Sequence, residues 1–398
     1  MATDITTLAI AIAGVIIILG LIINWFSRKI KISSAILIIL LGVILGPVLG
    51  LFNPSEWSGI VKSVVTFALV VVLFDTGYKM KIRSIKSVIL SSTSLTTLAV
   101  LVTIIFGSLI AIFFFKLPWQ LAVLMGAIVA STDITVVAPL MENIRLPQKL
   151  VETLQLEATL NSPYAAIIAT TMAILVTSEG IGEGLLAFIG KTFLYQILIG
   201  IGLGILFGYG FVALLKHLNL ESSPQLLSIG LILITFAVSE FIGASGVFSV
   251  FIMGIILGNS QFQLKTIIHE FESTISLVII IFVFVLFGAL LNLTTLLAMG
   301  IAGLIFIAVV TVSRSLSVII YSRGRWGSEE KMLFLIEPRG MVCAVLALSY
   351  MHLFPNPNAI ISTVFGIMII TIILASFAQY LVKIKLSKTN VKAKKQAK

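Results

Sequence analysis

The sequence has little cysteine and little charge. Its single cysteine, Cys343, cannot form a disulfide within one chain, so no disulfide framework is expected. Charged side chains make up 11% of the residues, against about 25% in soluble globular domains. The hydrophobic fraction is 59%. This composition excludes an ordinary soluble domain and predicts a chain that lies mostly within lipid.

Motifs of catalysis are also missing. The sequence has no HExxH, no nucleophile elbow and no paired catalytic aspartates, and its three histidines fall at the ends of hydrophobic segments. An enzyme is therefore not expected. A channel is disfavoured because no pore-loop filter or ring-forming repeat is found. Basic residues are not interleaved with aromatic ones and no zinc spacing occurs, so no nucleic acid partner is expected.

What the sequence does contain is a succession of long hydrophobic segments. A helix needs about 20 apolar residues to cross a bilayer, and such runs recur along the whole chain. They predict an all-α polytopic membrane protein with about 13 transmembrane helices. The expected spans are residues 5–26, 33–52, 61–78, 87–115, 119–141, 150–176, 185–215, 224–242, 244–258, 267–292, 296–320, 331–352 and 358–382.

The basic residues predict the orientation. Lysine and arginine gather after odd-numbered spans and in the tail 383–398, whereas only Lys62, Lys116 and Lys191 follow even-numbered spans. Positive residues favour the cytoplasmic side of a membrane. We therefore expect a multi-pass protein of the cell (plasma) membrane, with its N-terminus outside and its C-terminus in the cytoplasm. The net charge of +10 reflects this topology and needs no polyanionic partner.

Few ionisable residues fall inside the spans. Because a charge within hydrocarbon is costly, each is a candidate for function. Three of the acidic ones, Asp75, Glu240 and Glu337, are candidates for the ion pathway. Asp75 and Arg314 fall toward the cytoplasmic ends of their spans and Glu240 toward the outer end of its span. Asp75, Arg314 and Glu240 either reach the interface or line a vestibule. The complete set is Asp75, Asp133, Glu157, Glu240, Arg314, Glu337 and Arg339.

Asp133 lies in ASTDITVVAP, in the fifth span. Hydroxyl residues Thr132 and Thr135 flank it, and Pro139 follows. A carboxylate among hydroxyls near a helix breaker is typical of a locally unwound helix that faces a cavity. Oxygen ligands of this kind suit a monovalent cation, and a desolvated carboxylate can exchange a proton for it. A protonated structural aspartate is the alternative.

The stretch EATLNSPYAAI places further polar groups in the sixth span. Glu157 and Asn161 are four residues apart and share one helix face. Pro163 cannot donate to the carbonyl of Thr159, which leaves that oxygen available. We expect these polar atoms to face Asp133.

The segment IEPRG predicts a second interrupted helix, in the twelfth span. If residues of about 5–176 and 224–382 form two inverted repeats, with a linker helix at about 185–215, both breaks fall in the fifth span of their repeat. Arg339 needs an acidic partner within lipid. We expect an ion pair between Arg339 and Glu157, which would leave Asp133 free to titrate.

With these motifs the sequence resembles the monovalent cation/proton antiporter superfamily, in particular its NhaP-type sodium/proton exchangers. The resemblance covers nearly all of the chain. It rests on LFDTG at 73–77, ASTD at 130–133, EATLNSP at 157–163, GASGVFSVFIMGIILGN at 243–259 and EPRG at 337–340.

The resemblance implies a homodimer in which a core domain moves against a dimerisation domain. It also implies an ion site in which Thr132, Asp133, Glu157, Asn161 and Arg339 match the family pattern. Two positions depart from it: the second aspartate of the site is Ser162 here, and a serine ligand is Ala158.

The expected function is exchange of a monovalent cation for protons. Sodium is the expected cation, with lithium or potassium as alternatives, bound by Asp133 with help from Thr132, Asn161 and Ser162. No cofactor is expected beyond the transported ions. Loss of the second aspartate leaves three outcomes open: exchange by Asp133 alone, altered selectivity, or a non-transporting protein that keeps the fold.

Overall fold

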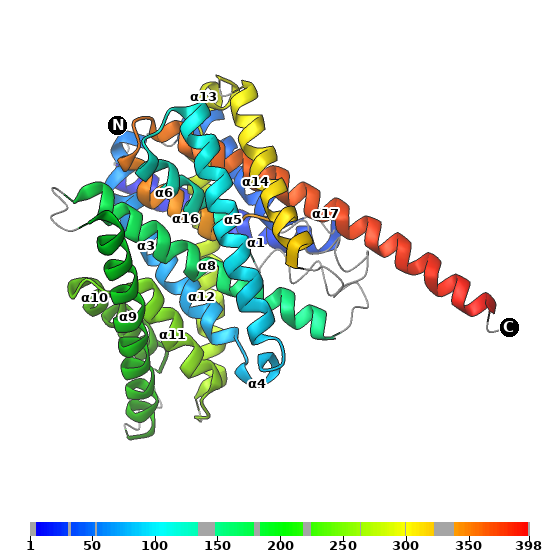
Figure 1. Cartoon of the computed structure of the whole chain (residues 1–398). Coiled ribbons are helices and arrows are strands. Elements are labelled where there is room, and N and C mark those ends of the chain that lie inside the picture. The colour runs from blue at the N-terminus through cyan, green and yellow to red at the C-terminus, as the bar shows by residue number, and fades with distance from the viewer. Residues whose placement is uncertain are drawn as a thin grey trace. The chain divides into compact units, whose positions relative to one another are not determined.

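The structure is a computed structural model, and it describes residues 5–30, 33–51, 54–133, 148–178, 184–217, 224–262, 264–298, 300–321 and 338–396. Every regular element within these ranges is helical (Figure 1). The chain divides into two compact units. It passes from one to the other after Lys81, after Ala298, and within the helices α8 (Gln148–Thr177), α16 (Met341–Tyr350) and α17 (Pro357–Gln396). Each unit draws helices from both halves of the chain, which suits the predicted pair of repeats; the repeats themselves stay a prediction.

Unit 1 comprises residues 1–81, 173–298 and 344–365. Its helices are α1 (Ile5–Ile30), α2 (Ser34–Val43), the π-helical turn η1 (Ile44–Val48), α3 (Pro54–Lys79), α9 (Leu185–His217), α10 (Pro224–Phe241), α11 (Gly246–Asn259), α12 (Lys265–Ala289), α13 (Leu293–Ala298), most of α16 (Met341–Tyr350) and the short turn η2 (Met351–Leu353).

Unit 2 comprises residues 82–172, 299–343 and 366–398. Its helices are α4 (Ile82–Ile85), α5 (Ile89–Phe115), α6 (Trp119–Ala130), most of α8 (Gln148–Thr177), α14 (Gly300–Tyr321) and most of α17 (Pro357–Gln396).

The predicted class, an all-helical polytopic membrane protein, is confirmed. Among the described residues, 8 helices are long and apolar enough to cross a bilayer, namely those at Ile10–Ser27, Ile89–Phe115, Gln148–Thr177, Ala187–Leu215, Pro224–Phe241, Lys265–Ala289, Gly300–Tyr321 and Pro357–Phe377. Shorter apolar helices occupy Ser34–Val48, Trp119–Ala130, Gly246–Asn259 and Met341–Leu353. The count of about 13 spans stays a prediction.

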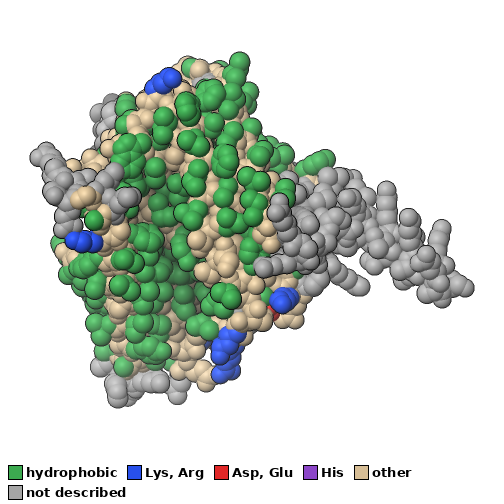
Figure 2. All heavy atoms as spheres, viewed as in Figure 1, with side chains coloured by type: hydrophobic (Ala, Val, Ile, Leu, Met, Phe, Trp, Pro, Cys, Tyr) green, Lys and Arg blue, Asp and Glu red, His purple; other side chains and the backbone are tan. Residues whose placement is uncertain are grey.

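The surface is apolar in the way that a lipid-exposed protein requires. Hydrophobic side chains cover much of the face in Figure 2, and lysine and arginine are few. On α5, for example, Leu90 is 80% exposed and Phe113 is 65% exposed. Such side chains would be costly in water but not in hydrocarbon.

Two predicted spans that follow each other almost directly, 224–242 and 244–258, are separated by a tight turn. Helix α10 ends at Phe241, and Gly243 has a φ of +76°, a conformation that favours glycine. Helix α11 then begins at Gly246, where Ser245 caps it by accepting from the amide of Phe248.

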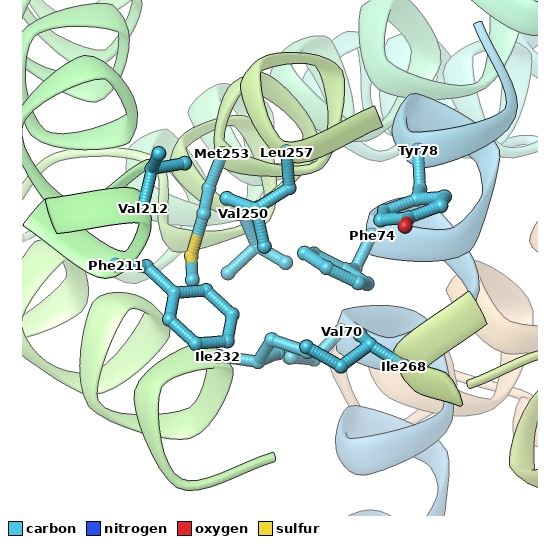
Figure 3. Packing of buried hydrophobic residues seen from close by; sticks show 10 residues of the cluster. All are labelled: Val70, Phe74, Tyr78, Phe211, Val212, Ile232, Val250, Met253, Leu257 and Ile268. Carbon is cyan, nitrogen blue, oxygen red and sulfur yellow. The ribbon is translucent and has the colours of Figure 1, made fainter. Parts of the chain in front are cut away.

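The core of unit 1 forms where α3 and α11 approach closely. A Cβ added at Gly254 would meet the carbonyl oxygen of Phe74, and one added at Gly77 would meet that of Phe251. Small residues at such crossings let helix backbones touch, which is how helices associate in lipid. Side chains from α3, α9, α10, α11 and α12 close around this crossing in the cluster of Figure 3, which comprises Val70, Phe74, Tyr78, Phe211, Val212, Ile232, Val250, Met253, Leu257 and Ile268.

Gly254→Ala is expected to destabilise the protein, because the new methyl group forces α11 away from α3. Overpacking of this kind costs about 1–3 kcal/mol. Gly210→Ala, in α9, is the matched control, since nothing lies within 4 Å of a Cβ at that position. Thermal unfolding in detergent measures both variants, and equal unfolding temperatures would contradict the close crossing.

Candidate ion-binding site

The candidate site lies in unit 2, where the end of α6 meets the start of α16. Helix α6 ends at Ala130, and residues 131–133 are not helical; residues 338–340 are not helical either, and α16 begins at Met341. The main-chain amide of Asp133 donates to the carbonyl oxygen of Pro338 at 3.0 Å. One side of each predicted interruption is therefore described: α6 ends before Asp133, and α16 begins after Pro338. Residues 134–147 and 322–337, with Pro139 and Glu337, lie outside the described residues, so the interruptions themselves stay a prediction.

The carboxylate of Asp133 lies at the N-terminal end of α16. Its Oδ2 accepts a hydrogen bond from the amide of Met341 at 2.8 Å, and Asp133 is 7% exposed. The first amides of a helix have no partner within the helix and carry partial positive charge, so they stabilise an anion there. A Cβ added at Gly340 would overlap the Asp133 carboxyl group, so only glycine fits beside it.

Helix α8 presents two polar side chains to this break. The Nδ2 atom of Asn161 donates to Thr132 Oγ1 at 2.7 Å and to Glu157 Oε1 at 2.8 Å. The Oγ of Ser162 lies 3.1 Å from Ser131 Oγ and 3.3 Å from the carbonyl oxygen of Thr132. The structure thus brings Thr132, Asn161 and Ser162 together, as the sequence predicted. Their role in ion binding stays a prediction.

The side-chain amide oxygen of Asn161 is not used by these hydrogen bonds. Both of its amide hydrogens are used by Thr132 and Glu157, whereas its Oδ1 is buried and has no hydrogen-bond partner among the described residues. A buried acceptor without a donor costs about 1–3 kcal/mol. An oxygen of this kind is a ready ligand for a hard cation.

The predicted ion pair between Glu157 and Arg339 is wrong. Glu157, which is fully buried, forms its ion pair with Arg314 of α14, whose side chain is 3% exposed. The sequence placed Arg314 near a span end, where it could have reached the interface. It instead packs inside unit 2, and spacing along the chain could not decide which arginine meets the glutamate.

Arg339 instead donates hydrogen bonds to the C-terminal end of α6. Its Nη1 donates to the carbonyl oxygens of Ala130 at 2.7 Å and Ser131 at 3.3 Å. The last carbonyls of a helix have no amide to accept from, and a cation suits the negative end of the helix dipole. Cys343 Sγ lies 3.0 Å from the same Ser131 oxygen, and Thr371 Oγ1 accepts from the Arg339 amide at 3.0 Å.

Sequence reasoning missed Ser131, Arg314, Cys343 and Thr371 as parts of this framework. Ser131 was adjacent to the predicted break, and Arg314 was one of two arginines within spans, so both carried a signal. Cys343 and Thr371 carried none, because a small polar residue in a hydrophobic helix most often packs without further function.

The remaining pathway candidates have local structural partners in unit 1. Asp75 Oδ2 accepts from Lys79 Nζ at 2.6 Å, and Glu240 Oε1 accepts from the amide of Gly246 at 2.8 Å, at the start of α11. Glu337 lies outside the described residues. A role of these three in the pathway stays a prediction.

The chemistry of the site is that of oxygen ligands. Among the described residues, no group of three or more histidine, cysteine, aspartate or glutamate side chains could hold a metal ion. The oxygens described at the break are the Asp133 carboxylate, the hydroxyls of Thr132 and Ser162, and main-chain carbonyls. Such a set suits a hard monovalent cation better than a transition metal.

Comparison with known proteins agrees with this geometry. The model of the family described as "Sodium/hydrogen exchanger, transmembrane" matches residues 14–380. The chain belongs to the sodium/hydrogen exchanger family. Membership covers α6, α16 and every residue of the candidate site.

Curated members of the exchanger family are similar along most of this chain. The Na(+)/H(+) antiporter 1 of Methanocaldococcus jannaschii is 29% identical over 86% of this chain and 83% of its own length. The K(+)/H(+) antiporter NhaP of Alkalimonas amylolytica is 27% identical over 92% of this chain, and the chain covers 64% of that relative. The chain spans about half the length of the K(+)/H(+) antiporter NhaP2 of Shewanella oneidensis.

The fold is also that of a solved exchanger. The structure of the sodium proton antiporter MjNhaP1 from Methanocaldococcus jannaschii superimposes with a TM-score of 0.83. It covers 95% of this chain and 99% of its own, at 24% sequence identity. At that identity the likeness shows the fold.

A double-mutant cycle tests the ion pair of the site. Glu157→Gln and Arg314→Met are each expected to cost about 3–5 kcal/mol, because either change leaves an uncompensated buried charge. The double variant should lose much less than the sum of the two.

Glu152→Gln is the control for this cycle, since Glu152 lies on the same helix and its bond to Gln148 Nε2 is at the exposed surface. It should cost less than about 1 kcal/mol. Thermal or denaturant unfolding gives the free energies, and additive losses at Glu157 and Arg314 would contradict the pair.

Proposed function

We propose that this protein exchanges a monovalent cation for protons across the cell membrane, with Asp133 as the group that holds the two in turn. The observation that carries the proposal is the position of the Asp133 carboxylate. It is buried between the end of α6 and the start of α16 and accepts from the Met341 amide, beside the oxygens of Thr132, Asn161 and Ser162.

The chemistry of a single carboxylate supports alternating occupancy. The Met341 amide contributes partial positive charge and can keep its hydrogen bond whether a proton or a monovalent cation is bound. One negative charge cannot hold both at full strength. Alternation between the two is what couples their movement in an exchanger.

The departure at Ser162 supports a coupling of one cation to one proton. Serine carries no charge, and Glu157 is committed to Arg314. Among the described residues, that leaves Asp133 as the carboxylate at the break that would change its charge during transport. We therefore favour exchange by Asp133 alone over loss of transport, since the carboxylate, the glycine beside it and the adjoining ends of α6 and α16 are in place.

Sodium is the cation that we propose. Names of relatives support either choice, because the Methanocaldococcus relative is named as a Na(+)/H(+) antiporter and those of Alkalimonas and Shewanella as K(+)/H(+) antiporters. Selectivity depends on the size of the cavity that the ligands leave and on their number. Potassium and lithium are therefore outcomes of the transport test.

We also propose a homodimer, with the N-terminus outside the cell and the C-terminus in the cytoplasm. The distribution of lysine and arginine supports the orientation. The dimer rests on the resemblance to NhaP-type exchangers.

Asp133→Asn should abolish exchange, because asparagine can accept from Met341 but can neither bind a proton nor offer a charge. Proteoliposomes with an imposed sodium gradient and an internal pH dye measure the flux, and potassium and lithium gradients measure selectivity. Glu152→Gln, near the N-terminal end of α8, is the control and should transport normally. Undiminished flux in Asp133→Asn would remove this residue from the mechanism.

Ser162→Asp should strengthen sodium-dependent exchange and make it sensitive to membrane potential. The added carboxylate faces the Thr132 carbonyl oxygen, so it is stable there only with a proton or a cation between the two oxygens. Flux measured with and without a potassium–valinomycin potential gives the answer. Unchanged flux and unchanged voltage dependence would place position 162 away from the ion.

Labelling of an introduced cysteine tests the orientation. The native Cys343 is buried, so the unaltered protein should not react with a membrane-impermeant maleimide. Ser387→Cys in the tail should react in inside-out vesicles and stay unlabelled in intact cells. Labelling in intact cells would reverse the proposed topology.

A further inference from the structure

Two carboxyl groups are buried together in unit 1, outside the ion-binding residues. Asp75 lies near the C-terminal end of α3 and is 6% exposed. Glu272 lies near the N-terminal end of α12 and is 1% exposed. Ser276, one helical turn after Glu272 on α12, donates to Asp75 Oδ2 at 3.3 Å, so the two carboxyl groups lie near each other. Two neighbouring anions within lipid would repel each other strongly unless each is neutralised.

Asp75 is neutralised by a cation. Its Oδ2 accepts from Lys79 Nζ at 2.6 Å and from Ser276 Oγ at 3.3 Å. The Lys79 side chain is 52% exposed, so the charged end of the pair reaches the surface of unit 1. Asp75 therefore has a cation as its partner.

Glu272 has no such cation. Among the described residues, its hydrogen-bond partner is the Oγ of Ser228, which lies 2.5 Å from Glu272 Oε1, and Oε2 has no partner. No lysine, arginine or histidine of the described chain lies within ion-pair distance of it. A bare carboxylate in this position would be an uncompensated charge in the interior of the unit.

The two oxygens near the Ser228 hydroxyl indicate how Glu272 is neutralised. Ser228 Oγ also lies 2.7 Å from the main-chain oxygen of Gln225, which can only accept. A serine hydroxyl has one hydrogen to donate. If that hydrogen goes to Gln225, the hydrogen between Ser228 and Glu272 comes from Glu272. The opposite assignment sets two acceptors 2.7 Å apart with no hydrogen between them.

The packing around Glu272 is consistent with a neutral acid. Ile268, Glu272 and Ser276 follow one another at intervals of four on one face of α12. Ile268 belongs to the apolar cluster of Figure 3, together with Tyr78 and Phe74 of α3. The carboxyl group thus continues an apolar surface.

The other titratable groups on α12 and on the helices that pack against it either contact residues other than Glu272 or lie at the surface. On α3, Tyr78 donates to the Lys265 carbonyl oxygen and stacks on His269 at 5.2 Å. Lys265 Nζ donates to the carbonyl oxygens of Gly258 and Ser260. Of the side chains that the structure describes on these helices, the remaining titratable groups are Lys29 of α1, which lies over Trp25, Glu240 at the far end of α10, and the exposed Glu270 of α12; α2 has none.

We propose that Glu272 is a proton-binding site of unit 1, a carboxylic acid that holds its proton at neutral pH through the hydrogen bond that it donates to Ser228. Release of this proton at alkaline pH places a second negative charge beside Asp75. The site takes a proton and is separate along the chain from the residues that we assign to the transported ion.

Infrared spectroscopy of the full chain reconstituted in lipid tests this site directly. A protonated carboxyl group has a carbonyl-stretching band that a carboxylate lacks. At neutral pH the spectrum should contain a component that Glu272→Gln removes and that alkaline pH removes reversibly from the unaltered protein. Glu270→Gln, two residues away on the exposed side of α12, is the matched control and should keep the component.

Two further variants make the result decisive. Ser228→Ala should keep the component and shift its frequency, because the carboxyl group loses its acceptor; this reading does not depend on the folding of Glu272→Gln. Asp133→Asn should keep it as well, so loss of transport and loss of this proton are distinguished. An identical spectrum in Glu272→Gln, or an unshifted one in Ser228→Ala, would overturn the proposal.

Discussion

The candidate site depends on one contact between two helix ends. Asp133, just past the end of α6, accepts from the first amide of α16, and its own amide donates to Pro338 just before α16 begins. Each helix end leaves main-chain groups that a lipid-embedded protein must satisfy internally. Here main-chain groups of each non-helical segment form hydrogen bonds with the other segment. These bonds hold the Asp133 carboxylate in place at a point where the chain is not helical. Gly340 is the residue that allows the approach, since a side chain there would occupy the space of the carboxyl group.

Arg314 and Arg339, two buried arginines of unit 2, bind different groups of the site. Arg314 pairs with Glu157, and through Asn161 this pair is connected to the Thr132 hydroxyl. Arg339 donates to the carbonyls at the end of α6. The first arrangement fixes the orientation of the Asn161 amide, so its oxygen is left for another partner. The second keeps the break of α6 from winding back into a helix, because the carbonyls are already occupied.

Much of the fold was predictable from the sequence, because a span long enough to cross a bilayer leaves a plain signal in hydropathy. The end of α6 and the start of α16 were also predictable, from Thr132–Asp133 and from Pro338–Gly340. What the sequence could not predict was partner choice. Its pattern placed Arg339 within a span and Arg314 toward a span end, and only the packing of α14 against its neighbours brings Arg314 to Glu157. The bond between Ser228 and Glu272 joins residues 44 apart on separate helices, and neither residue belongs to a motif.

The buried carboxyl groups of this protein are held in three ways, and the difference bears on which of them can change charge. Asp75 and Glu157 are paired with cations. Lys79, the partner of Asp75, is half exposed, whereas Arg314, the partner of Glu157, is buried. Protonation of Glu157 would leave the Arg314 charge buried alone, which costs several kcal/mol. Asp133 accepts a hydrogen bond from a main-chain amide, and Glu272 shares one with the hydroxyl of Ser228. That hydroxyl carries no charge, so a proton can leave or return to Glu272 without stranding a buried cation. This property is what suits Glu272 to the proton-binding role that we propose for it.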